Sequence, residues 1–104
     1  MFIKGVGMTK FGVQEDSSNH IIYEATLEAL NDADMSMEDV DAVVLSNNDF
    51  LSNGERQRHS ASMVSSLFQK KMPIITVPAG CGGGGTALWT AIKMQKNGGY
   101  ANIL

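Results

Sequence analysis

The chain has 104 residues, of which 43% are hydrophobic and 18% are charged, and its formal net charge is −3. This composition is typical of one globular domain with a real core, and it excludes a disordered chain. The acidic balance, with no basic cluster beyond Lys70-Lys71, argues against nucleic acid as a partner. The apolar runs are too short to span a membrane, so we expect no membrane partner either.

Cys81 is the only cysteine of the chain, so no internal disulfide can form. The first residues also lack the long apolar stretch of a signal peptide. A single thiol fits a reducing compartment, and we therefore expect a cytoplasmic protein. The seven methionines are expected to fill gaps in the core.

Four short apolar runs predict strands, at residues 2–8, 42–45, 74–77 and 101–104. None of them alternates cleanly between apolar and polar residues. This pattern is typical of strands that are covered on both faces of a parallel sheet.

Helical patterns lie between these runs. The first covers residues 21–33, with Ser17, Ser18 or Asn19 as the N-cap, and a capping turn at Ser36 and Asp39 follows it. A second helix is predicted over residues 60–69, and it should bury Met63, Val64, Leu67 and Phe68. A third covers residues 86–96 and ends at residues 97–99, with one side formed by Ala87, Leu88, Ala91, Ile92 and Gln95.

The predicted order is therefore β-α-β-α-β-α-β, an α/β fold with a mainly parallel sheet and helices on both faces. The polar stretch 46–58 is expected to be a solvated connection. The chain ends at Leu104 inside a predicted strand, where a terminal carboxylate would be unfavourable. We therefore expect residues 1–104 to be one incomplete domain of a longer protein.

Cys81 lies where the third predicted strand turns into the third predicted helix. Ligands of open α/β sheets bind at the carboxyl ends of the strands. A helix N-terminus at that point would favour the thiolate, which is the nucleophilic form of cysteine. The backbone N–H of Cys81 could also face a developing oxyanion. These features predict a catalytic nucleophile, although a lone cysteine is often only a small buried hydrophobic residue.

Four glycines follow Cys81 at once, and their bare backbone would let a substrate approach it. Gly82, Gly83 and Gly84 are therefore the candidate substrate-binding residues. The same run also matches the dinucleotide fingerprint, with Gly80, Gly82 and Gly85 as its glycines. That fingerprint needs an acidic residue about 20 positions later, and residues 86–104 contain none.

A phosphate-binding P-loop is also disfavoured, because Thr86 stands where that motif has its lysine. Nucleotide binding is therefore the weaker alternative. The residues suggest no metal site.

Three segments in the same order resemble the thiolase superfamily. They are GVGMTKFG (residues 5–12), EATLEALNDADMSMEDVDAVVLSNND (residues 24–49) and VPAGCGGGGTALWTAIKM (residues 77–94). The chain is most similar to the N-terminal part of archaeal and sterol-carrier-type thiolases, of the acetyl-CoA C-acetyltransferase kind, over nearly all its residues. The resemblance makes Cys81 the residue that accepts the acyl group.

The resemblance further implies half of a thiolase fold, an acyl-CoA substrate and no separate cofactor. It implies a homo-oligomer, either a dimer or a tetramer, and possibly a small partner subunit. The product would come from Claisen-type condensation or from thiolysis. The family's catalytic base and acid lie in a C-terminal half that this sequence does not contain, and neither His20 nor His59 falls in its catalytic motifs. The glycine run is also richer in glycine than the family's pattern, which leaves the substrate open.

Two expectations follow for the chain itself. Without a general base, the 104 residues should not turn over substrate. A half-fold should also expose apolar surface and self-associate. The alternative to an enzyme is a thiolase-like interaction subunit that docks through an unpaired strand edge.

Overall fold

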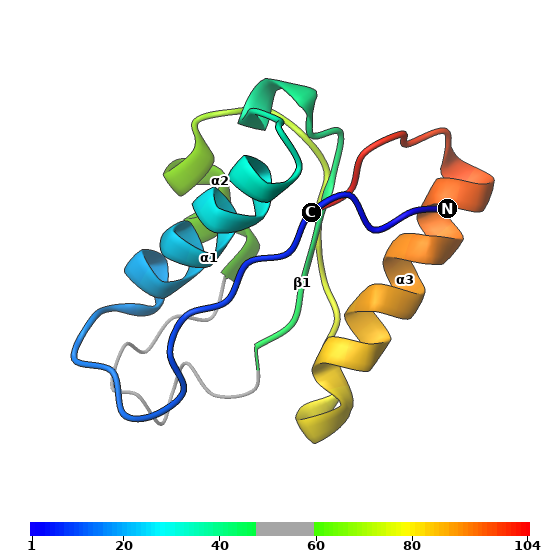
Figure 1. Ribbon diagram of the computed structural model, residues 1–104. Coiled ribbons are helices and arrows are strands. Elements are labelled where there is room, and N and C mark those ends of the chain that lie inside the picture. The colour runs from blue at the N-terminus through cyan, green and yellow to red at the C-terminus, as the bar shows by residue number, and fades with distance from the viewer. Residues whose placement is uncertain (48–59) are drawn as a thin grey trace.

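The computed structural model describes residues 1–47 and 60–104. Its elements follow one another as α1 (Ser18–Asp32), the 3-10 turn η1 (Met37–Asp39), β1 (Val43–Leu45), α2 (Ser60–Phe68), β2 (Ile74–Thr76), the 3-10 turn η2 (Gly80–Gly82) and α3 (Gly83–Gly98). Helices α1 and α2 lie on one side of the strands and α3 lies on the other (Figure 1). The predicted α/β class, with helices on both faces, is confirmed.

Strands β1 and β2 are parallel, and Val43, Val44 and Leu45 lie opposite Ile74, Ile75 and Thr76. Both lie within the predicted strands 42–45 and 74–77. The backbone N–H of Val77 extends the pairing, because it donates to the carbonyl of Leu45 at 2.9 Å. A right-handed crossover through α2 is the usual way to connect such a parallel pair.

The predicted strand 101–104 also pairs with β1, on the edge opposite β2. Ile103 forms a parallel bridge with Ala42. Leu104 donates to the carbonyl of Ala42 at 3.0 Å and accepts from the N–H of Val44 at 2.8 Å. Three parallel segments thus lie side by side, with β1 in the middle.

The prediction of a strand at residues 2–8 is wrong, because this segment forms no strand ladder. Its backbone bonds to side chains of α1 instead. The N–H of Val6 donates to Asp32 at 2.9 Å, and the N–H of Met8 donates to Glu28 at 2.7 Å. Gly7 lies so close to α1 that a Cβ atom there would overlap the carbonyl of Ala25. The segment therefore lies along α1 (Figure 1).

The three predicted helices are present, with shifted ends. Ser17 is the N-cap of α1, and its Oγ accepts from the N–H of His20 at 3.4 Å. α2 ends one residue earlier than predicted, before Gln69, whose φ of 52° is left-handed. α3 begins at Gly83, three residues before the predicted start, and runs to Gly98.

The core lies between the strands and the α1–α2 layer. Its buried side chains are Leu30, Val40, Val43 and Val64, and half-buried residues pack around them, including Met35, Met37, Met63 and Met72. Methionine thus packs against the core at four positions, whereas Met1 and Met8 are exposed. Of the side chains predicted to be buried on α2, Val64 is fully buried, and Met63, Leu67 and Phe68 are half-buried.

Among the described residues, no helix has the length and apolar character that crossing a bilayer would require.

Candidate functional site

Cys81 lies in the 3-10 turn η2, between the end of β2 and the first residue of α3. Its side chain is exposed, so a small reactant can reach the sulfur. The turn begins at Gly80, whose φ of 52° is in the left-handed region that favours glycine. The chain thus reverses sharply after β2 and presents the thiol at the carboxyl end of the parallel strands.

Hydrogen bonds hold this turn together. The N–H of Gly82 donates to the carbonyl of Ala79 at 3.0 Å, and the N–H of Gly83 donates to the carbonyl of Gly80. The hydroxyl of Thr86 donates to the carbonyl of Gly82 at 3.1 Å, which ties the first helical turn back to η2. In the described part of the chain, the N–H of Cys81 has no hydrogen-bond partner. It is therefore available to a bound oxygen atom.

The glycine run has two kinds of surroundings. A Cβ atom at Gly82, Gly84 or Gly85 would meet nothing within 4 Å, so these backbones border open space. Gly83 is buried, and a Cβ atom there would overlap the Oγ of Ser46, just beyond β1. At Gly82 and Gly84, the two open glycines nearest to the exposed thiol, bare backbone lets a flat thioester group approach.

Helix α3 begins two residues after the cysteine, at Gly83, and has 16 residues. Its N-terminal end carries a partial positive charge that favours a nearby anion. No acidic side chain stands in its first turn to neutralise that charge. The electrostatic setting therefore suits a negative sulfur or a negative oxygen at the start of α3.

The structure does not bring a histidine in the described residues to Cys81. His20 is exposed in the first turn of α1, which lies across the strands from α3 (Figure 1). His59, and the predicted connection from residue 48 to residue 58, lie outside the described residues. Within residues 1–47 and 60–104, no group of three His, Cys, Asp or Glu side chains could hold a metal ion.

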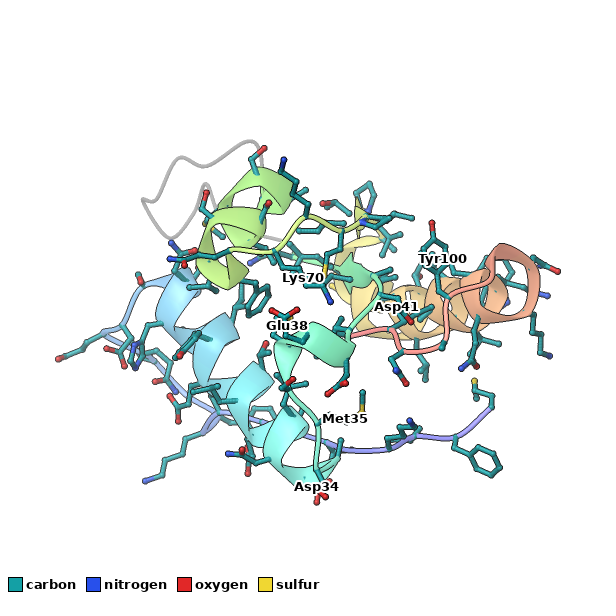
Figure 2. The ribbon with its side chains drawn as sticks, turned by 90° about the horizontal axis from the view of Figure 1, so that it is seen from above. Asp34, Met35, Glu38, Asp41, Lys70 and Tyr100 are labelled. Atoms are coloured by element: carbon teal, nitrogen blue, oxygen red, sulfur yellow. The ribbon has the colours of Figure 1, made fainter. Side chains whose placement is uncertain are left out.

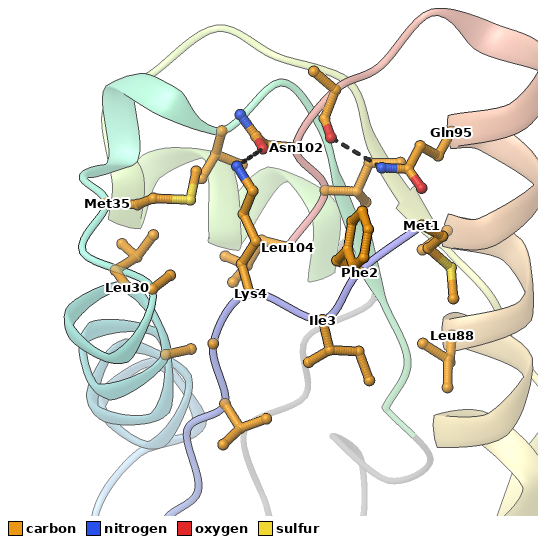
Figure 3. Close-up of a pocket in the computed structure, with 18 of the residues that line it drawn as sticks. Met1, Phe2, Ile3, Lys4, Leu30, Met35, Leu88, Gln95, Asn102 and Leu104 are labelled. Carbon is orange, nitrogen blue, oxygen red and sulfur yellow. Dashed lines mark hydrogen bonds between the residues drawn. The ribbon is translucent and has the colours of Figure 1, made fainter.

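A wide apolar groove lies away from Cys81, between the N-terminal segment, α1, α3 and residues 101–104. Its volume is about 540 Å³. Figure 3 shows Phe2, Ile3 and Leu88 around it, with Leu104 and Leu30 deeper in. Phe2 is 88% exposed and Leu88 is 52% exposed. Cys81 does not line this groove, so we place the candidate reacting centre at Cys81. We treat the groove as an exposed apolar surface.

Two polar residues hold the opposite end of the strands, and sequence patterns did not reveal either of them. Lys70 donates to the carbonyls of Met37, Glu38 and Val40 at 3.1, 2.6 and 2.6 Å. Figure 2 shows its side chain reaching toward the turn that carries Glu38. Asp41 accepts from the N–H groups of Ala101 and Asn102, both at 2.9 Å. The only sequence-level hint is general: backbone carbonyls and N–H groups at the ends of helices and strands need partners from elsewhere in the chain.

No family model matches this chain. It is 29% identical over 102 residues to the beta-ketoacyl-(acyl-carrier-protein) synthase III of Fusobacterium nucleatum, a match that covers 96% of this chain and 30% of that protein. It is 33% identical over 102 residues to the mycobacterial beta-ketoacyl-(acyl-carrier-protein) synthase III of Mycobacterium tuberculosis, with 96% and 29% covered. The chain thus spans about 30% of the length of the curated relatives it matches.

A crystal structure shows the same similarity. The chain superimposes on the 3-oxoacyl-(acyl-carrier-protein) synthase III of Aquifex aeolicus with a TM-score of 0.70 and 27% identity, over 86% of this chain and 29% of that one. These relatives are members of the thiolase-like superfamily. All three are named as ketoacyl- or oxoacyl-(acyl-carrier-protein) synthases III, and none of the three is an archaeal or sterol-carrier-type thiolase. The described fold is therefore a portion of a thiolase-like α/β fold.

Proposed function

We propose that this chain carries the acyl-accepting part of a thiolase-like acyltransferase, with Cys81 as the nucleophile. The observation that carries the proposal is an exposed thiol in the turn before α3, beside open glycine backbone and a backbone N–H that has no partner among residues 1–47 and 60–104. The similarity to condensing enzymes over 96% of the chain supports the same reaction class.

The sulfur of Cys81 attacks the carbonyl carbon of an acyl thioester. A carbon–sulfur bond to Cys81 forms, and the carbonyl electrons move onto the oxygen. The N–H of Cys81 and the positive end of α3 stabilise that negative oxygen, which is usually the largest catalytic contribution in acyl transfer. The oxygen then reforms the carbonyl and expels the leaving thiolate. The leaving thiolate takes up the proton lost by Cys81, so no cofactor beyond the substrate is needed.

The substrate is proposed to be an acyl-CoA thioester, with Gly82 and Gly84 bordering the bound acyl group through bare backbone. Gly83 is buried, so we propose that its role toward the substrate is limited to its backbone atoms. The names of the relatives add a second acyl source, a thioester on a carrier protein. Both sources present the same thioester carbon to the sulfur, so the chemistry at Cys81 is shared.

We propose that the second half-reaction, Claisen-type condensation or thiolysis, is not completed by these 104 residues. It needs a group that removes a proton from the second thioester or activates the attacking thiol. His20 is on the other side of the strands from α3, so it does not supply this group (Figure 1). Cys81 is then acylated once per chain and stays acylated.

We further propose a cytoplasmic homo-oligomer, a dimer or tetramer. The single cysteine and the exposed apolar residues of the groove support this assignment. An interaction subunit without catalysis is the alternative, and it would use the outer edge of residues 101–104, whose inner edge bridges to β1 at Ile103.

The deciding experiment is acylation of the purified chain by acetyl-CoA, followed by peptide mapping. The proposal predicts an acetyl group on the peptide that contains Cys81. Cys81→Ser should lose the thioester, and Cys81→Ala should show no adduct at this position. An unmodified Cys81 peptide after exposure to both acetyl-CoA and an acetyl carrier protein would refute the acyltransferase and leave the interaction subunit.

A further inference from the structure

Gly83 differs from its neighbours in one respect that matters for the thiol. It is the buried glycine of the run, and Gly82, Gly84 and Gly85 are exposed. A Cβ atom at Gly83 would overlap the Oγ of Ser46 and lie 3.1 Å from the Cβ of Ser46. An added Cβ atom at Gly83 would therefore require the Ser46 side chain or the start of α3 to shift.

Ser46 is fixed by the sheet. It directly follows β1, whose last residue, Leu45, lies opposite Thr76 of β2. The carbonyl of Leu45 also accepts the N–H of Val77 at 2.9 Å. The start of α3 and the carboxyl end of β1 lie at the same end of the molecule (Figure 1). Ser46 thus lies where the first turn of α3 packs against the carboxyl end of β1.

Cys81 lies between these two attachments. On one side it follows the β2 pairing by four residues, and on the other it precedes Gly83 by two. The N–H of Gly83 also bonds back to the carbonyl of Gly80, so a shift of Gly83 moves the whole η2 turn. The packing of Gly83 against Ser46 therefore determines the position of the thiol and of the backbone N–H of Cys81.

We propose that Ser46 is a positioning residue for acyl transfer, acting through its contact with Gly83. This inference rests on the proposed function of Cys81. It gives the serine a role that its residue type does not suggest, because Ser46 acts by filling space and touches no reacting atom. An added Cβ atom at position 83 pushes the start of α3 and Ser46 apart, and a displacement of the start of α3 by about 1 Å can cost up to roughly 100-fold in rate.

The test is a compensating pair of substitutions. Gly83→Ala is expected to slow acetylation of Cys81 by acetyl-CoA by about tenfold or more. Ser46→Gly in the same chain removes both the Oγ and the Cβ, so the methyl group added at position 83 takes up the vacated space and should restore the rate to within about threefold of the original. Ser46→Gly alone leaves that space empty and should slow acetylation. Ser46→Ala removes only the Oγ and leaves the Cβ that would lie 3.1 Å away, so its rescue should be partial.

The matched control is Gly85→Ala, in the same helical turn, where an added Cβ meets nothing within 4 Å. This variant should be acetylated at nearly the original rate. Thermal unfolding of every variant separates positioning from stability. A contact that only stabilises the fold would change the melting temperature and leave the acetylation rate of the folded protein unchanged, and that result would overturn the proposal.

Two further outcomes are decisive. If Gly83→Ala alone does not fold, the Ser46→Gly/Gly83→Ala chain must fold and be acetylated, and its failure would also overturn the proposal. If the original chain is never acetylated, the proposed function fails by itself. The positioning role is then judged by alkylation of Cys81 with iodoacetamide, whose rate follows the thiolate fraction. That rate should fall in Gly83→Ala and recover in the double variant, and an unchanged rate would refute the positioning role.

Discussion

The carboxylate of Asp41 accepts the backbone N–H of Asn102 at 2.9 Å, and it holds the N–H of Ala101 at the same distance. Asp41 stands just before β1, and Asn102 stands at the start of the segment that pairs with it. Figure 2 shows Asp41 beside the chain that carries Tyr100. One side chain therefore joins the exit of α3 to the middle of the sheet, across 61 positions of sequence.

Replacing this carboxylate should loosen the edge of the sheet. Asp41→Ala removes the acceptor of two N–H groups, and we expect the free energy of unfolding to fall by about 1–2 kcal/mol, since the site is exposed to water. Asp41→Asn keeps an acceptor oxygen without the charge and should lose about half as much. Urea unfolding measures both, with Glu24→Ala on the exposed face of α1 as the control. Equal stability of Asp41→Ala and the original chain would contradict this role.

Lys70 should matter more than its neighbour Lys71. Lys70→Met removes the donor of three carbonyl groups around η1, and we expect a loss of roughly 2–3 kcal/mol in the free energy of unfolding. Lys71→Met changes an exposed lysine and should stay within about 0.5 kcal/mol. Chemical unfolding of the two variants gives a direct comparison. A similar loss in both would show that the charge, and not the three hydrogen bonds, is responsible.

Acid should weaken the turn at Asp39. Hydrogen bonds from the backbone N–H and then the hydroxyl of Ser36 hold the pKa of Asp39 below its usual value of 3.8, and Lys70 adds a smaller effect in the same direction. A lowered pKa favours the ionised form more in the folded than in the unfolded state. The resulting stabilisation is therefore fully present above pH 3.8 and is lost as the pH falls through the lowered pKa.

Melting temperatures between about pH 5 and pH 2 test this dependence. The original chain should lose more stability on acidification than Asp39→Asn, whose side chain does not titrate. Parallel curves for the two proteins over this range would show that Asp39 contributes nothing to the acid dependence.

The apolar groove should drive self-association. Phe2 and Leu88 are exposed in it, and contiguous apolar surface of this kind marks an interaction site. Phe2→Ser combined with Leu88→Ser should shift the chain toward monomer in analytical ultracentrifugation. Val13→Ser is the control, because Val13 is fully exposed and does not line the groove. A chain that is already monomeric at high micromolar concentration would contradict the prediction.

The patterns in the sequence predicted the elements that local physics determines. The capping turn is an example, since Ser36 and Asp39 stand three residues apart and bond to each other. The position of Cys81 between a strand and a helix was also predictable, because an apolar run, a proline–glycine turn and an amphipathic stretch follow one another.

The predictions that were wrong concern segments whose conformation depends on partners far away in the sequence. Residues 2–8 read as a strand because they are apolar, but their N–H groups bond to carboxylates 20 and 26 positions away on α1. The start of α3 was placed at Thr86, because glycine disfavours helix. In the structure α3 begins at Gly83, which packs against Ser46 of a distant segment, and no pattern within the glycine run reveals that partner.

The amount of CoA released when the chain meets excess acetyl-CoA shows most directly whether Cys81 accepts the acyl group. We expect a single burst of at most about one CoA per chain, no sustained turnover, and no burst from Cys81→Ala. A burst of equal size from Cys81→Ala, or no release from the original chain, would contradict the assignment of Cys81 as the acyl acceptor.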